Sequence, residues 1–139
     1  MAKKIDELPV YQRALEFCAA VIALLARPGL VKDQGLRKQI SEANDSITAN
    51  MEEGFEQPTD ASFANYLFIA KGSLGEVLGR LRRARLKEYI TQSELDARLK
   101  DGEELGRMIG GFIRYLTESN FKDRGRHRAK TASEEKVEK

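Results

Sequence analysis

The sequence predicts an all-α protein: an antiparallel up-down-up-down four-helix bundle followed by a disordered C-terminal tail. Three observations predict this fold. Apolar residues recur at alternating spacings of three and four in four long segments, strong helix formers dominate the composition, and no segment shows the alternation of a strand. The 139 residues suffice for one compact domain. Short connections leave no room for crossovers, so successive helices should run antiparallel.

Local start and stop signals set the expected helix boundaries. Pro9 suits a first helical position, and Pro28-Gly29 is interpreted as the stop of that helix before a short turn. Thr91 and Glu94 form a capping box before the last helix. After a lead-in at residues 1–8 we expect a bundle at 9–121, with helices at about 9–27, 33–55, 60–88 and 92–119.

The third predicted helix, capped by Thr59 or Asp60, has two apolar faces. Its inner stripe runs from Phe63 to Ala84. The opposite side carries a second set of apolar and small residues: Phe68, Gly72, Gly75, Gly79 and Leu86. Each mid-helix glycine costs about 1 kcal/mol relative to alanine, so three in one register require an explanation. We expect this face to be an oligomer interface, since small residues let helices approach closely.

The fourth predicted helix also carries glycines spaced four apart. Its inner face is expected to hold Leu105, Met108, Ile109, Phe112, Tyr115 and Leu116. Displaced from that stripe are Gly102, Gly106 and Gly110, beside Leu95, Leu99 and Ile113. These glycines fit either a contact with another chain or close packing between helices of one bundle, and the sequence leaves both interpretations open.

Cations are concentrated at the end of the third helix and in the tail. Five lie within eight residues: Arg80, Arg82, Arg83, Arg85 and Lys87. They predict a surface for nucleic acid or an acidic partner. A solvated face is the alternative, because Glu76 can pair with Arg80 and cations complement a helix C-terminus.

The tail at residues 122–139 is polar and charged, so we expect it to be disordered. Its candidate phosphate contacts include Arg124, Arg126 and Arg128. A solubilising terminus is the equal alternative.

Catalytic chemistry is hard to find, and we expect no enzyme, no cofactor and no metal. The single histidine, His127, lies in the tail, which excludes histidine-based triads and bundle-type di-metal sites. Cys18 lies among apolar residues and is interpreted as a small buried side chain. No segment reaches the roughly 20 apolar residues of a membrane span, so a cytoplasmic protein with no membrane partner is expected.

Three blocks of residues are more specific than the general pattern. They are Leu8-Pro9-Val10-Tyr11-Gln12-Arg13-Ala14; Gly35-Leu36, Gln39-Ile40, Ala43, Ser46-Ile47, Asn50 and Glu53-Gly54; and Phe63, Tyr66-Leu67, Ile69-Ala70, Gly72-Ser73-Leu74 and Glu76. Over about residues 8–118 the chain thereby resembles the four-helix-bundle family encoded in intervening sequences of bacterial 23S ribosomal RNA genes. Tyr11 departs from it, standing where tryptophan is common.

The resemblance implies more specific partners than the residue pattern alone does. It implies a homo-oligomer, a pentamer in that family. Related accessory variability proteins of diversity-generating retroelements bind a reverse transcriptase and nucleic acid. The expected function is therefore a non-catalytic oligomeric bundle that binds RNA or DNA, or a nucleic-acid enzyme such as a reverse transcriptase, as an accessory factor. The alternative is a structural or protein-interaction adaptor without nucleic-acid affinity.

Overall fold

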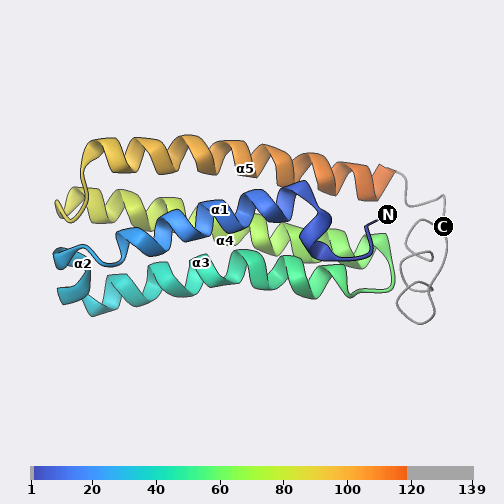
Figure 1. Cartoon of the computed structure of the whole chain (residues 1–139), viewed down its shortest axis with the longest axis horizontal. Helices are drawn as coiled ribbons and strands as arrows, with labels where there is room; N and C mark the ends of the chain where they lie inside the picture. The colour runs from blue at the N-terminus through green and yellow to red at the C-terminus, as the bar shows by residue number, and fades with distance from the viewer. Residues whose placement is uncertain (1, 119–139) are drawn as a thin grey trace.

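The computed structural model describes residues 2–118, and this part of the chain is all-α (Figure 1). A 3-10 turn, η1, covers Ile5–Glu7. The helices that follow are α1 (Pro9–Leu24), α2 (Pro28–Lys32), α3 (Gln34–Phe55), α4 (Asp60–Leu86) and α5 (Gln92–Glu118). Within these residues there is no strand. None of the helices there is both long and apolar enough to cross a membrane.

The four long helices lie side by side along the longest axis of the molecule (Figure 1). Helices α1 and α4 each pack against both α3 and α5. Helices α1 and α4 are therefore diagonal neighbours, and the apolar side chains of all four helices enclose one core. A face of α1 or α4 that points away from this core is not covered by any of the other three long helices.

As residue numbers rise along α1, the residues of α3 that α1 contacts have falling numbers. Tyr11 donates its hydroxyl proton to Glu52 at 2.6 Å, whereas Arg37, near the start of α3, donates from Nε to the Leu25 carbonyl oxygen at 3.1 Å. The colour ramp of Figure 1 follows the same course, so α1 and α4 both progress from right to left in that view.

The structure differs from the sequence-based expectation at the end of the first helix. Pro28-Gly29 was expected to be a stop before a turn, but α1 already ends at Leu24 and Pro28 begins the short helix α2. Proline has no N–H to donate and a fixed φ, which suit the first position of a helix as well as they terminate one. Asp33 then caps α3 by accepting from the Leu36 N–H at 3.2 Å.

The caps of the two longest helices match their sequence signals. Thr59 caps α4, its Oγ1 accepting from the Ser62 N–H at 3.1 Å. At the start of α5, Thr91 Oγ1 accepts from the Glu94 N–H at 3.1 Å and Glu94 Oε1 accepts from the Thr91 N–H at 2.9 Å. This reciprocal capping box confirms the prediction and fixes where α5 leaves the preceding loop.

The inner face of α5 is rotated relative to the expected stripe. Tyr115 was expected inside but is 46% exposed, with its ring stacked on Phe112. Leu95, Gly102 and Ile113, expected beside the stripe, are buried. The reason is that α5 packs against both α4 and α1, and a helix between two neighbours buries a wider arc than one apolar stripe.

One buried polar side chain ties α1 to α3. Asn44 is 1% exposed, and its Nδ2 donates to the Cys18 carbonyl oxygen at 3.1 Å. The Cys18 thiol is itself buried, and burial raises its pKa to about 12. A thiol with that pKa stays protonated at neutral pH, so Cys18 is a packing residue and not a nucleophile.

Candidate nucleic-acid interface

The basic end of the molecule is built around the C-terminus of α4. The Tyr89 N–H donates to the Ala84 carbonyl oxygen and the Glu88 N–H to the Arg85 carbonyl oxygen, both at 2.9 Å. Glu88 has a φ of 64°, which completes a Schellman termination. Glycine is the usual residue at such a position because a Cβ strains the left-handed conformation.

This termination directs Tyr89 back onto α2 and the start of α3. A Cβ added at Gly29 would lie 2.2 Å from a ring carbon of Tyr89, so the ring occupies the space that a side chain would need. The Tyr89 hydroxyl donates to Asp33 Oδ2 at 2.9 Å, and Lys87 Nζ lies 3.0 Å from the same oxygen. Asp33 thereby links α2, α3 and the end of α4.

The charges of this cluster shift one another's pKa values. The hydrogen bond from Lys87 lowers the pKa of Asp33, with help from the Leu36 N–H and the Tyr89 hydroxyl. Conversely, the bond to Asp33 raises the pKa of Lys87. Lys87 therefore stays charged, but Asp33 of its own chain compensates that charge, which makes Lys87 a poor candidate for a phosphate contact.

The other four cations of the predicted cluster differ in how free they are. Arg82 and Arg83 are exposed, and neither forms an ion pair within residues 2–118. Arg85 donates to Gln92 at 3.2 Å. Arg80 is half-buried and donates to the carbonyl oxygen of Glu76 at 3.4 Å, not to its carboxylate as expected. Arg82 and Arg83 are thus the most available of the five.

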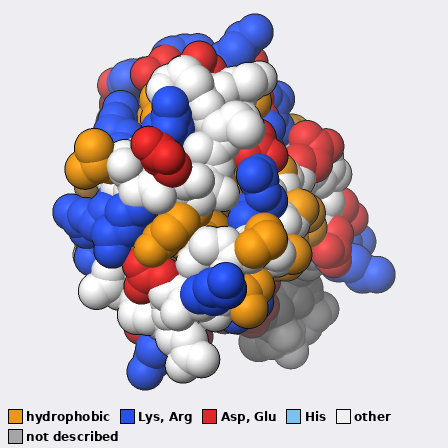
Figure 2. All heavy atoms as spheres, turned by 90° about the vertical axis from the view of Figure 1, so that its left-hand side faces the viewer, with side chains coloured by type: hydrophobic (Ala, Val, Ile, Leu, Met, Phe, Trp, Pro, Cys, Tyr) orange, Lys and Arg blue, Asp and Glu red, His pale blue; other side chains and the backbone are white. Residues whose placement is uncertain are grey.

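Three further cations at this end were not singled out from the sequence. Lys32 ends α2, and Arg37 and Lys38 lie in the first turns of α3. They are far from α4 in the sequence, and only the packing of the start of α3 against the end of α4 brings them to the same end. Figure 2 looks onto this end, where Lys and Arg side chains are distributed among apolar side chains and a smaller number of acidic ones.

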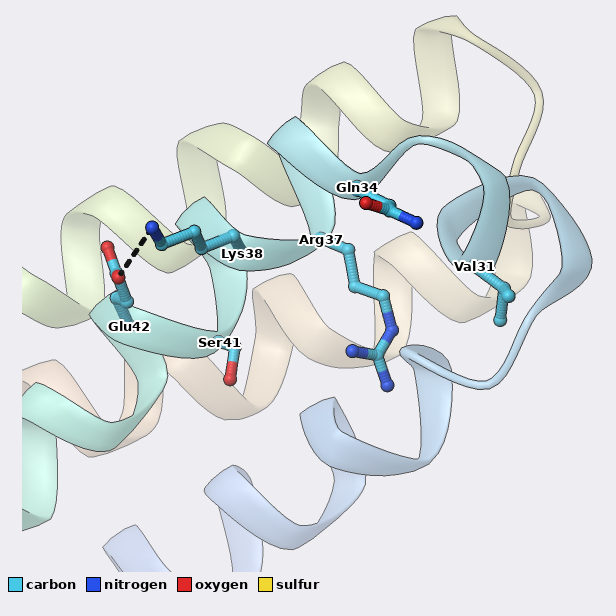
Figure 3. A pocket seen from close by; sticks show the side chains of 6 residues that line it. All are labelled: Val31, Gln34, Arg37, Lys38, Ser41 and Glu42. Atoms are coloured by element: carbon cyan, nitrogen blue, oxygen red, sulfur yellow. Dashed lines mark ion pairs between the residues drawn. The ribbon is translucent and has the colours of Figure 1, made fainter.

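An open hollow on α3 lies beside these cations. It is lined by Val31 of α2 and by residues of the first half of α3, namely Gln34, Arg37, Lys38, Ser41 and Glu42. Figure 3 shows Arg37 extending toward the segment between α1 and α2, and Lys38 turned along the helix to its ion pair with Glu42 at 3.9 Å. Two of its lining residues are therefore cations on the basic end.

The tail cannot be assigned a place in this site. Arg124, Arg126 and Arg128 lie outside the described residues, as does His127. In residues 2–118 no group of three His, Cys, Asp or Glu side chains is arranged to hold a metal ion.

The outer stripe of α4 is exposed along its length. Phe68 is 58% exposed and Leu86 is 81% exposed. Among residues 2–118, a Cβ added at Gly72, Gly75 or Gly79 would meet nothing within 4 Å beyond the backbone of its own helix. These three glycines therefore have no packing role within residues 2–118.

The glycines of α5 differ from those of α4. A Cβ at Gly102 would lie 2.8 Å from a methyl carbon of Leu78, and one at Gly106 would lie 3.7 Å from Leu74. Both neighbours belong to α4. Of the two interpretations left open by the sequence, packing between helices of one chain therefore holds for Gly102.

The fold and this end define a class: an all-helical protein with four long amphipathic helices and a cation-rich end. The sequence profile described as 23S rRNA-intervening sequence protein matches residues 6–111. The chain belongs to this family. A search among curated proteins finds no match.

A solved structure is similar to this chain over about three quarters of its length. It is described as the crystal structure of a protein with unknown function from the S23 ribosomal protein family of Bacteroides thetaiotaomicron. The two chains are 29% identical, with a TM-score of 0.68, and the match covers 76% of this chain and 98% of the other. The similarity supports the helical fold and assigns no activity.

Proposed function

We propose that the chain is a non-catalytic, antiparallel four-helix bundle of the cytoplasm that assembles as a homo-oligomer and binds nucleic acid through its basic end. The observation that carries the nucleic-acid part is the pair Arg82 and Arg83, which are exposed and without an ion pair in residues 2–118. Unpaired arginines attract phosphates, and Lys32 and Arg37, which form no ion pair within residues 2–118, enlarge the field at the same end.

Two parts of the proposal rest on the resemblance alone. The resemblance to retroelement accessory proteins implies a reverse transcriptase, or another nucleic-acid enzyme, as the protein partner, and it implies a pentamer. A reverse transcriptase gene beside the gene for this chain would support that partner. A position inside a 23S ribosomal RNA gene would instead point to RNA of the ribosome.

The experiment compares two variants of equal charge. Arg82→Glu with Arg83→Glu removes the free arginines, whereas Arg107→Glu with Arg114→Glu makes the same charge change on exposed positions of α5. Affinity for a structured RNA and for duplex DNA is measured over a series of salt concentrations. We expect the first variant to bind more weakly. The slope of its log affinity against log salt concentration should become shallower by the equivalent of about two phosphate contacts, while the second variant changes little.

Equal losses in the two variants would mean that net charge, and not the basic end, governs binding. If the wild-type protein bound neither nucleic acid at low salt, the adaptor without nucleic-acid affinity would be the better description. Capture of a protein partner after nuclease treatment would then be the next measurement.

A further inference from the structure

Helix α1 has an apolar outer face that the rest of residues 2–118 leaves uncovered. Leu15 is 44% exposed and Ile22 is 56% exposed, with the exposed Ala19 between them. Leu15 and Ile22 are seven residues apart, so they lie on the same side of the helix. The chain therefore presents two exposed apolar faces, one on α1 and the other on the diagonal helix α4.

Contacts through α3 establish how α1 and α4 are aligned along the long axis of the molecule. The position of a residue along this axis is called its height. Asn44 donates to the Cys18 carbonyl oxygen at 3.1 Å, and two residues further along α3 the hydroxyl oxygens of Ser46 and Ser73 lie 2.7 Å apart. Because residue numbers fall along α4 as they rise along α3, the position of α4 level with Asn44 lies two residues after Ser73. Cys18 and Gly75 are therefore at about the same height.

The two outer faces then match residue by residue. Helices α1 and α4 progress in the same direction (Figure 1), each by about 1.5 Å per residue. Leu15 precedes Cys18 by three residues and is level with Gly72, which precedes Gly75 by three. Ile22 follows Cys18 by four residues and is level with Gly79. Bulky side chains on one face are thus at the heights of glycines on the other.

We propose that copies of this chain pack side by side, with Leu15 and Ile22 of one copy seated on Gly72 and Gly79 of the next. Copies related by rotation about an axis parallel to the helices keep their heights, so the matched residues meet. The large side chains fill space that residues 2–118 leave open, since a Cβ at either glycine would meet no side chain of that part of the chain within 4 Å. This contact presupposes the proposed homo-oligomer, and the two surfaces that meet in it are the outer faces of α1 and α4.

Charge complementarity at one edge of this contact favours a second copy as the occupant. Glu16 is 75% exposed beside Leu15 and lies 3.8 Å from Arg13, which itself contacts α5, so Glu16 is on the α5 side of its face. Lys71, beside Gly72, is also on the α5 side, because a Cβ at Gly110 of α5 would lie 3.7 Å from its Nζ. When the two copies are related by rotation about an axis parallel to the helices, the α5-side edge of the α1 face in one copy lies beside the α5-side edge of the α4 face in the other. Glu16 of the first copy then lies near Lys71 of the second.

The two faces are different surfaces, so the contact is heterologous and continues from copy to copy until it closes. Leu15 and Ile22 follow Tyr11 and Cys18 by four residues, and both of those residues contact α3. The α1 face is therefore turned toward α3 instead of lying directly opposite the α4 face, which curves the assembly into a ring. Every α4 C-terminus then lies on the same side of the ring, where several basic ends bind one nucleic acid with avidity.

Disulfide cross-linking of the full chain tests the register. Leu15→Cys with Gly72→Cys places two thiols at one height on faces that point away from each other within one chain, so an oxidised bond can join only different copies. We expect a ladder of linked species on a non-reducing gel. Leu15→Cys with Gly79→Cys is the matched control, because the mismatch of seven residues separates the thiols by about 10 Å. Cys18 is buried in both variants.

Each outcome has one meaning. A ladder with the matched pair and not with the mismatched pair supports the contact, and Glu16→Lys should slow its formation roughly two- to fivefold at low salt, with Lys71→Glu restoring it. Equal linking of both pairs, or linking of neither, overturns it. Light scattering and the nucleic-acid assay on the same proteins separate a wrong interface from a wrong function, since an intact oligomer that binds RNA but does not cross-link contradicts only the interface.

Discussion

Helices α4 and α5 both carry three glycines in helical register, but the two sets have opposite surroundings. Gly102 of α5 faces Leu78 so closely that a Cβ would lie 2.8 Å from it, whereas Gly72, Gly75 and Gly79 of α4 face open space. Gly102 lets α4 and α5 approach each other closely, and Gly106 and Gly110 also face side chains of α4, at 3.7 Å from an added Cβ. The second set meets no side chain within residues 2–118, and because mid-helix glycines cost helix propensity, we propose that another copy of the chain covers them.

The largest expected effect comes from filling the space at Gly102. Gly102→Leu should lower the free energy of unfolding by about 1–3 kcal/mol, because the new side chain collides with Leu78 between α4 and α5. Gly111→Leu on the same helix is the control, since a Cβ there meets nothing within 4 Å. Urea unfolding measures both, and equal losses would show that side-chain size alone, without the contact, is responsible.

Gly54 should be to the contact between α3 and α4 what Gly102 is to the contact between α4 and α5. A Cβ at Gly54 would lie 2.8 Å from both the Phe63 ring and the Tyr66 Cβ, and a Cβ cannot rotate away. We expect Gly54→Ala to destabilise the fold by about 1–2 kcal/mol despite the better helix propensity of alanine. An increase in the urea midpoint would contradict close packing between α3 and α4.

Glu88 presents the reverse situation, a position where glycine fits better than the residue present. Its φ of 64° strains an L-residue, so Glu88→Gly should stabilise the protein by about 1 kcal/mol. Lys87→Gly, one residue earlier, should destabilise it, because that position has a φ of −83° and its side chain bonds to Asp33. Thermal unfolding of the pair distinguishes backbone strain from a general effect of glycine.

The smallest effect concerns pH at the basic end. The pKa of Asp33 is lowered from 3.8 in the folded state, so its contribution to stability is present above that value and is lost as pH falls through the folded pKa. Asp33→Asn should therefore lose less stability than the wild type on acidification from about pH 5 to about pH 2. Unfolding curves at several pH values measure this difference, and parallel curves would show that Asp33 has the same pKa in both states.

The stripes, the caps and the exposed face of α4 could be predicted from sequence because each depends on spacing within one helix. Pro28 could not be assigned, since the same residue both ends and begins helices. Tyr115 was placed inside because its exposure depends on where α5 sits between two neighbours. Arg37 and the pairing of Lys87 with Asp33 were missed for a related reason: both require knowing which ends of distant segments meet.

The most direct test of the account is the mass of the protein in solution, because the open glycine face of α4 matters only if another copy covers it. Light scattering of the wild type should give a multiple of the 15.7 kDa chain mass. Gly75→Leu should give the single-chain mass with unchanged helicity by circular dichroism, since its Cβ meets nothing within the chain. A wild-type protein of single-chain mass, or a Gly75→Leu variant with the full oligomer mass, would contradict the account.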